Sequence, residues 1–288
     1  MTPRQALRRW VPFEARLAIR VARRRVVDRV SGVRFAAARG DARGFPIVVA
    51  SYDRPFIDYP GQEGLSVAKR KNQALLAASL TGTIIRPRQT FAVWKLAQRP
   101  SRSLGYEQAA ALKAGELTTD IGGAICLLST VLYNVALLGG LRVTERHCHS
   151  VDSYGERRYF ELGRDAAIEY GYRDLRFLNT HPVPVLLEVD VTDQAVAAML
   201  RAAAPVDVRV QLRVTEPELL APPPAIVTID SSLSPGAQVV VSPALPGLRL
   251  RTYRTITFED GTRENEDLGE TVHVPRPAVM RRGPTRVA

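Results

Sequence analysis

The chain has 288 residues and carries 40 lysines and arginines against 29 aspartates and glutamates, a formal net charge of +11. Its 45% apolar and 24% charged content excludes a disordered chain, and its length suits one large or two small domains. The sequence has no uninterrupted apolar run of about 18 residues, so no membrane-spanning helix is predicted, and two cysteines cannot build a disulfide framework.

The first 44 residues form a basic N-terminal arm, with twelve arginines and three acidic residues, a net charge of +9. Apolar residues recur at helical spacing from Leu7 to Val30, which predicts a basic amphipathic helix. Residues 1–30 are compatible with an anionic membrane surface, with Trp10 and Phe13 as wedges, with nucleic-acid phosphates, or with packing on the rest of the chain.

The body of the chain lacks a basic stripe with interleaved aromatic residues, which argues against nucleic-acid binding. Arginines also occupy the places where a secretory signal needs apolar residues, whereas an arginine-rich organelle transit peptide fits the arm less badly. We therefore expect a cytoplasmic or peripheral membrane location.

Residues 45–205 are predicted to form the core domain. A helix over 124–138 is apolar almost all round, which is typical of a buried helix. Further helices are predicted over 66–80 and 107–113, with a short apolar element at 91–94. The predicted strands span 46–51, 83–85, 141–146, 158–162, 167–170, 176–179 and 183–191.

Residues 206–275 are predicted to form a β-rich C-terminal extension, and residues 276–288 a disordered tail. The predicted strands span 206–214, 225–229, 238–241, 248–258 and 270–274, with turns at proline and glycine between them. The expected fold class is α+β: a buried central helix with a cysteine at its N-terminus packs on a mostly antiparallel sheet, followed by the β-rich part.

Cys126 follows a Gly-Gly turn in the first turn of that buried helix. A helix N-terminus favours the thiolate over the thiol, because unpaired N–H groups and a partial positive charge gather there. His147 and His149 end the next strand and are expected to share one of its faces, so either can serve as the base of a cysteine nucleophile. A cysteine in an apolar helix is also commonly a small buried hydrophobe.

The segments 122–134 (GGAICLLSTVLYN) and 145–150 (ERHCHS) resemble the signature of VanW-domain proteins. Flanking matches include Asn72 and segments 82–87, 105–106, 163–166 and 170–175, so the resemblance spans about residues 65 to 192. Some members of that family are understood to be L,D-transpeptidases of bacterial cell walls that use the motif cysteine as nucleophile. The resemblance therefore implies acyl transfer on peptidoglycan peptide stems or their precursors, with no cofactor.

Carried over residue by residue, the resemblance makes Cys126 the acyl acceptor and His149, which precedes a serine as in the family pattern, the general base. Asp165 is expected to orient the imidazole, and the main-chain N–H groups of residues 124–126 to stabilise an oxyanion. Substrate contacts are expected from seven further motif residues: Gly122, Gly123, Ser129, Tyr133, Asn134, Arg146 and Ser150.

Two departures from the family pattern bear on activity. Ala124 replaces the third glycine of the turn, and Leu127 replaces a polar residue after the cysteine. The alternative is a non-catalytic module that binds peptidoglycan or glycopeptide with a degenerate site. A zinc site of Cys126, His147, Cys148 and His149 has suitable ligand types but too tight a spacing, so no metal is expected, and a Cys126–Cys148 disulfide is a weaker possibility.

Overall fold

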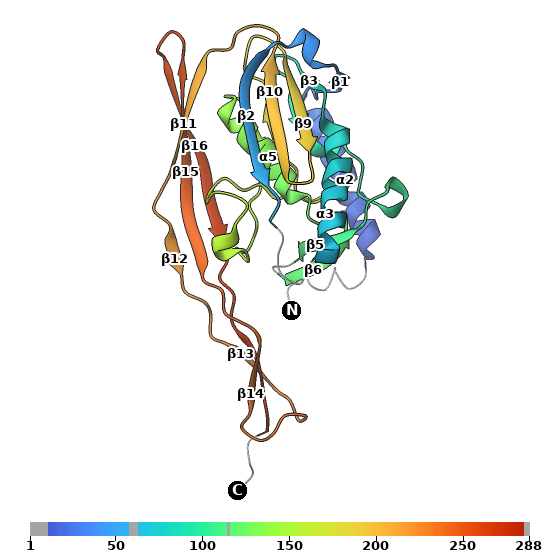
Figure 1. The fold of residues 1–288 in the computed structure, drawn as a ribbon, viewed down its shortest axis with the longest axis vertical. Coiled ribbons are helices and arrows are strands. Elements are labelled where there is room, and N and C mark those ends of the chain that lie inside the picture. Colours follow the sequence, from blue (N-terminus) through green and yellow to red (C-terminus); the bar gives the residue numbers. More distant parts are fainter. Residues whose placement is uncertain (1–10, 58–62, 114–115, 285–288) are drawn as a thin grey trace.

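The computed structural model describes residues 11–57, 63–113 and 116–284. Figure 1 shows helices gathered around one sheet, and beside them a long β-structure that continues beyond the sheet toward the C-terminus. The α+β class with a β-rich C-terminal part is confirmed.

A five-stranded antiparallel sheet, in the order β1–β3–β9–β10–β2, forms the framework of the core. Buried and half-buried residues alternate along β10, because successive side chains of a strand point to opposite faces of the sheet. The strands are β1 Ala38–Arg39, β2 Ile47–Pro55, β3 Thr83–Ile85, β9 Val185–Val191 and β10 Ala195–Ala202.

Two helices pack on this sheet. Helix α5 (Cys126–Leu138) lies across β2 and β10, and helix α3 (Glu63–Leu80) lies against β9. Every residue from Leu127 to Leu137 is buried, as expected for a helix without a polar face. The central helix therefore begins at the cysteine and is enclosed over nearly its whole length.

Helix α2 (Phe13–Val30) packs on the outside of the core, whereas Leu7 and Trp10 of the predicted helix lie outside the described residues. Leu17 and the carboxylate of Asp28 are buried in the contact. Asp28 accepts hydrogen bonds from both terminal nitrogens of Arg176, at 2.6 and 3.1 Å, and pairs with Lys95 Nζ at 2.9 Å. The helix is therefore fixed by a buried ion cluster as well as by an apolar contact.

Two small sheets complete the core: β4 (Thr90–Ala92), β8 (Arg176–Leu178) and β7 (Arg142–Glu145) form one, and the hairpin of β5 (Gln108–Lys113) and β6 (Glu116–Ile121) the other. The helix predicted over 107–113 was wrong, because this segment pairs with β6 along its length. The strands predicted over 158–162 and 167–170 were also wrong. These loop segments carry no strand, and the remaining short helices are α4 Val93–Leu96, η1 Ala42–Gly44, η2 Arg102–Leu104 and η3 Gly155–Arg157.

The C-terminal part consists of two further sheets. The first joins β11 (Val208–Val214), β15 (Gly247–Phe258), β12 (Glu218–Leu220) and β16 (Arg263–His273). Arg254 of β15 is 1% exposed and donates at 2.9 Å to the oxygen of Leu137, at the end of α5. This contact fastens the first C-terminal sheet to the central helix.

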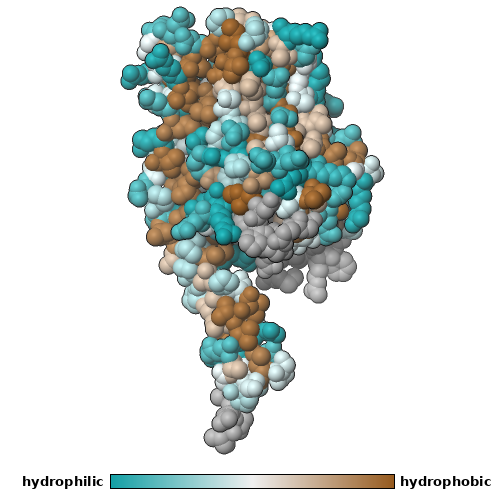
Figure 2. Space-filling view, viewed as in Figure 1, coloured by the Kyte–Doolittle hydropathy of each residue, from teal (hydrophilic) through white to brown (hydrophobic). Residues whose placement is uncertain are grey.

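The second C-terminal sheet lies at the far end of the molecule and joins β13 (Ile226–Ile229), β17 (Val279–Arg282) and β14 (Gln238–Ser242). Figure 2 shows apolar side chains gathered on this distal part, where Ile226, Val240 and Val241 are more than half exposed. The disordered tail predicted over 276–288 was wrong for residues 276–284, because β17 hydrogen-bonds to both neighbours. Residues 285–288 lie outside the described part.

Within the described residues, no helix is both long and apolar enough to cross a membrane.

Candidate active site

Cys126 follows a tight turn over residues 122–125. Gly122 and Ala124 both have left-handed backbone angles, with φ of +73° and +67°. A Cβ on Gly123 would lie 2.2 Å from the main-chain oxygen of Ala109, so only glycine fits at that position. The glycines of the motif therefore serve the backbone path that leads into the cysteine, and Ala124 adopts a conformation that is costly for a residue with a Cβ.

Two buried amides of α3 hold this turn from the opposite side. Asn72 Nδ2 donates to the main-chain oxygens of Glu107 and Gly123, at 2.9 and 3.1 Å, and Asn72 Oδ1 accepts from the Glu107 N–H at 2.8 Å. Gln73 Nε2 donates to the oxygen of Ala124 at 2.8 Å. These bonds, with those from the N–H groups of Gly122 and Gly123 to the oxygens of Glu107 and Asp120, fix the path of the turn.

The main-chain N–H groups of Ala124, Ile125 and Cys126 donate to no acceptor in the described parts of the chain. They belong to the orphan donors that every helix N-terminus leaves. The same N–H groups are the oxyanion donors expected from the sequence, and that role stays a prediction.

His149 and Asp165 lie close together next to this helix start. The Nδ1–H of His149 donates to Asp165 Oδ2 at 2.9 Å, and the main-chain N–H of His149 donates to the same oxygen at 2.7 Å. Arg146 holds the carboxylate from its other side, because its Nη2 donates to Asp165 Oδ1 at 2.8 Å. With Nδ1 occupied, Nε2 of His149 is the nitrogen left for the cysteine.

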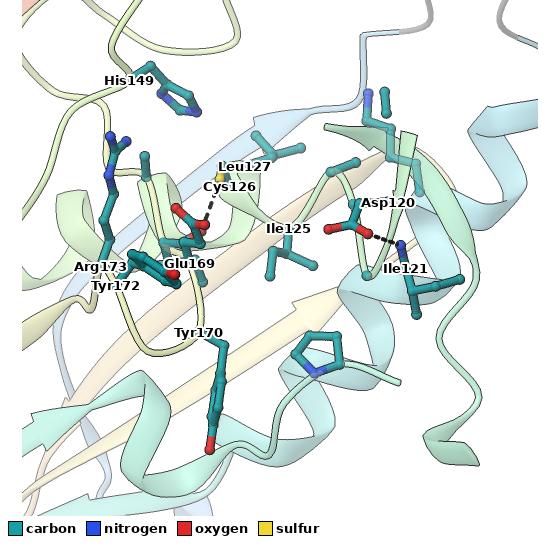
Figure 3. Close-up of a pocket in the computed structure, with 18 of the residues that line it drawn as sticks. Asp120, Ile121, Ile125, Cys126, Leu127, His149, Glu169, Tyr170, Tyr172 and Arg173 are labelled. Carbon is teal, nitrogen blue, oxygen red and sulfur yellow. Dashed lines mark hydrogen bonds between the residues drawn. The ribbon is translucent and has the colours of Figure 1, made fainter. Parts of the chain in front are cut away.

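The sulfur of Cys126 and the ring of His149 both line a cavity of about 1060 Å³. Figure 3 shows the sulfur at the helix start, with His149 and Arg173 to one side of it. Cys126 is half-buried and bonded to no other cysteine, and its Sγ lies 3.9 Å from the oxygen of Ile168. The thiol is therefore at the cavity wall and beside an imidazole, as nucleophilic chemistry requires.

Cys126, His149 and Asp165 shift one another's pKa values. Burial alone would raise the pKa of the Cys126 thiol, but the hydrogen bond and positive charge of His149 outweigh burial and lower it. Burial alone would lower the pKa of His149, yet its hydrogen bonds to Asp165 and Cys126 raise it to about 10. The pKa of the Asp165 carboxyl falls to about 2, because its bond to His149 and the charge of Arg146 outweigh burial. Each of these shifts is toward the charged form of its group, the thiolate of Cys126, the imidazolium of His149 and the carboxylate of Asp165.

An aromatic cluster packs around the imidazole. The ring of Phe160 stacks on His149 at a centroid distance of 5.8 Å, and Tyr159 Oη lies 3.2 Å from His149 Nε2. Tyr154 meets the imidazole edge to face at 6.1 Å. These residues limit the ring to one orientation. No motif of the sequence marked these three residues: Tyr159 and Phe160 lie in a segment predicted to be a strand, and Tyr154 precedes it.

The loops that carry His149 and Asp165 are supported by the first C-terminal sheet. Thr252 of β15 donates to the oxygen of Gly163 at 3.2 Å, and Arg146 Nη1 donates to Thr271 of β16 at 3.0 Å. The N–H of Val274 donates to the oxygen of Ser150 at 2.7 Å. The C-terminal strands therefore help to position the histidine and its carboxylate.

The expected substrate-contact residues divide into two groups. Gly122, Gly123 and Ser150 line the cavity. The other four residues are turned away from it and hold the framework together: Ser129, Tyr133, Asn134 and Arg146.

Hydrogen bonds show what two of these residues do. Ser129 Oγ donates to the oxygen of Ala166 at 2.6 Å, and Asn134 Nδ2 donates to the oxygen of Arg164 at 2.9 Å. Both bonds tie α5 to the loop that carries Asp165. The expectation that these motif residues contact substrate is corrected accordingly, because the signature also records the residues that hold the Asp165 loop on α5.

His147 and Cys148 do not take part in the site. The chain leaves β7 at Glu145, so His147 and His149 share no strand face. The ring of His147 pairs with Glu145 at 3.0 Å, while Cys148 Sγ lies 3.9 Å from the oxygen of Val272. In the described part of the chain, no group of three or more histidine, cysteine and acidic side chains is placed to hold a metal ion.

Comparison with known proteins bears directly on this arrangement. Residues 68–201 match the family of VanW like proteins, and residues 212–285 match the G5 domain. The first segment includes the cysteine, the histidine and the aspartate. The chain therefore contains a VanW like segment, residues 68–201.

Two curated relatives share this VanW-family segment. The chain is 30% identical over 132 residues to the vancomycin B-type resistance protein VanW of Enterococcus faecalis, which is 46% of this chain and 48% of the relative. It is 30% identical over 120 residues to the uncharacterized protein YoaR of Bacillus subtilis, which is 42% of this chain and 38% of the relative. The chain thus spans less than half the length of either relative.

Two solved structures of G5 domains resemble the C-terminal part. The G5 domain of HP0197 is 19% identical with a TM-score of 0.17, and covers 27% of this chain and 99% of that chain. The G5 domain of an IgA1 protease is 12% identical with a TM-score of 0.22, and covers 29% of this chain and 96% of that chain.

Proposed function

We propose that this VanW-family chain transfers acyl groups on cell-wall peptide stems, or on their precursors, through a thioester on Cys126. The observation that carries the proposal is the buried Asp165–His149 pair beside a cysteine that begins a helix at the wall of a large cavity. VanW-family membership and the neighbouring G5 match support a cell-wall-related role.

In the first half of the reaction, the thiolate attacks the carbonyl carbon of a peptide bond in the donor stem. The carbon–sulfur bond forms, and the orphan N–H groups at the start of α5 stabilise the oxyanion. The imidazolium of His149 then gives its Nε2 proton to the departing amine as the carbon–nitrogen bond breaks.

In the second half, an acceptor amine or water attacks the thioester, and neutral His149 accepts its proton. The new bond forms as the sulfur leaves as a thiolate, so the enzyme returns to its starting state without an oxidant or a cofactor. Asp165 keeps the imidazole in one tautomer through both halves.

The charge of the cavity suits an anionic peptide. Arg99, Arg102, Arg173 and Lys69 line it, against Asp120 and Glu169. Arg173 forms no ion pair within the described residues, its nearest acceptor being the oxygen of Cys148 at 3.4 Å. Cell-wall stem peptides carry free carboxylates, for which a guanidinium offers paired donors. We infer that Arg173 binds a substrate carboxylate near the cysteine.

Intact-mass analysis of the purified chain after incubation with peptidoglycan fragments tests the proposal. We expect an acyl adduct on the wild-type protein, and its loss in Cys126→Ala. The matched control is Cys148→Ala, which removes the other cysteine and is expected to keep the adduct. Acyl transfer through this residue is contradicted if the adduct persists in Cys126→Ala. It is also contradicted if none of the donor stems tested produces an adduct on the wild-type protein.

The alternative is a peptidoglycan- or glycopeptide-binding module, which Ala124 and Leu127 favour. A residue with a Cβ occupies a left-handed position of the turn, and an apolar side chain follows the cysteine at the cavity. A binding module predicts that fragments bind wild type and Cys126→Ala with equal affinity and that no adduct forms. Acyl transfer predicts the adduct and a dependence on Cys126.

A further inference from the structure

The orientation of helix α2 on the core is fixed, so one of its faces is permanently directed outward. Its inner face holds Leu17, which is 5% exposed, and Asp28, which is 6% exposed and lies between Arg176 and Lys95. Arg24 of the same face pairs with Glu145. These inner residues lie four, seven or eleven positions apart, which places them on one side of a helix.

The opposite face of α2 is an apolar stripe that no described residue covers. Ile19, Val26 and Val30 are 63%, 58% and 83% exposed. At about 3.6 residues per turn, they align with two exposed alanines along a single face. The outward stripe therefore consists of Ala15, Ile19, Ala22, Val26 and Val30.

Unpaired arginines border the stripe on both sides. On the helical wheel Arg23 lies along one edge, and Arg25 and Arg29 along the other. Arg20 lies nearer the inner face, where its guanidinium is 4.5 Å from the centre of the Tyr172 ring. All four are exposed, and none forms an ion pair with a described residue. The two acidic residues of α2 do not offset this charge, because Asp28 is buried against the core and Glu14 pairs with Arg99.

We propose that the outer face of α2 docks on an anionic lipid surface, with the apolar stripe at the level of the acyl chains and the arginines at the headgroups. An apolar face bordered by arginines is the pattern of a helix that lies in the membrane interface. Each arginine near such a surface contributes about 1 kcal/mol. This inference does not depend on the chemistry proposed for Cys126.

Other occupants of this face fit less well. Nucleic acid would bind the arginines through phosphates but would leave the apolar stripe exposed. A second copy of the chain would bring two sets of unpaired arginines together, which like-charge repulsion opposes. A lipid surface satisfies both the stripe and the charge.

Docking would also place the cavity close to the bilayer. Phe13 and Leu17 lie on α2 and line the same cavity as Cys126. The inner face of the helix thus belongs to the cavity wall, while the outer face meets the lipid.

Co-sedimentation of the full chain with vesicles tests the proposal. Vesicles containing phosphatidylglycerol are compared with vesicles of phosphatidylcholine alone. We expect binding to the anionic vesicles only, weakened by added salt. Replacing Arg23, Arg25 and Arg29 by glutamine is expected to weaken the partition coefficient by about 100-fold.

A second variant tests the apolar contact. The double substitution Ile19→Glu and Val26→Glu is expected to weaken the partition coefficient at least about tenfold. Its matched control is Leu219→Glu and Val240→Glu, which changes two exposed residues of the C-terminal sheets and should bind like wild type. Thermal unfolding of each variant confirms that it is folded.

Four results would overturn the inference. The first is equal binding to both kinds of vesicle. The second is anionic-vesicle binding that the Ile19 and Val26 substitutions leave unchanged. The third is a dimer in light scattering that dissociates on these substitutions, which would assign the stripe to a second copy. The fourth is tight binding of duplex DNA that the Ile19 and Val26 substitutions leave unchanged, with no binding to vesicles. This result would assign the arginines to nucleic acid.

Discussion

Replacing Asp165 by asparagine removes the negative charge that stabilises the imidazolium of His149. The carboxylate is fully buried, and its Oδ2 lies 2.9 Å from Nδ1 of the ring. An opposite charge within about 4–6 Å shifts a pKa by about 1–3 units. In Asp165→Asn the pKa of His149 is therefore expected to fall from its value of about 10, and the thiolate of Cys126 loses its partner cation.

The consequence can be measured as thiol reactivity. Because the pKa of Cys126 is lowered in the native chain, its thiolate persists to a pH below the usual range. We expect the midpoint of its alkylation by iodoacetamide to rise in Asp165→Asn, because a less basic imidazole is a weaker partner for the thiolate. Below the midpoint, each unit reduces the thiolate and the alkylation rate about tenfold. Peptide mass mapping separates labelling of Cys126 from labelling of Cys148.

The matched control is Asp174→Asn. Asp174 is also fully buried and bound to an arginine, Arg176, but contacts neither His149 nor Cys126. It is expected to leave the alkylation midpoint unchanged. If Asp165→Asn shifts the midpoint by less than about half a unit, the carboxylate does not maintain the charged pair and the reasoning fails.

Three further substitutions test the surrounding structure. Ala124→Gly is expected to stabilise the chain by about 1 kcal/mol in urea unfolding, because it relieves the left-handed strain; a loss of stability would contradict this. The pKa of buried His273 is lowered, so its contribution to stability is present above about pH 6.5 and lost as the pH falls. The free energy of unfolding of His273→Leu should therefore fall less than that of wild type between pH 7 and pH 5. An equal fall in the two proteins would refute this. Asp28→Ala removes the carboxylate that joins α2 to Arg176 and Lys95, although Arg176 keeps its bond to Asp174. It should cost about 2–3 kcal/mol and speed proteolysis of α2, whereas unchanged cleavage would show that the ion cluster does not hold the helix.

Local sequence patterns predicted the helices and strands whose buried residues recur with a regular period. The run from Leu127 to Leu137 has no polar face, and it forms a buried helix wherever the rest of the chain lies. Helix α3 and strands β3, β9 and β15 follow from the same kind of periodicity. The apolar periodicity that predicts each of them is contained within the helix or strand itself.

Two strands show where local patterns are insufficient. Strand β5 includes three consecutive alanines, which favour a helix, yet its backbone pairs with β6. Strand β10 is also rich in alanine and was not predicted, although it pairs with β9 on one side and β2 on the other. In both cases pairing with a neighbouring strand outweighs weak local propensity.

The site divides in the same way. The sequence by itself determined the cysteine at the start of a buried helix, and the family signature added His149 and Asp165. Only the tertiary structure placed Tyr159, Arg173 and Gln73 around them, and turned Ser129 and Asn134 from expected substrate contacts into supports of a loop. The physical reason is range: helix starts and apolar periodicity are set by neighbours in the chain, whereas cavity walls and hydrogen-bonded loops join residues from separate elements, and their closeness depends on the packing of the whole chain.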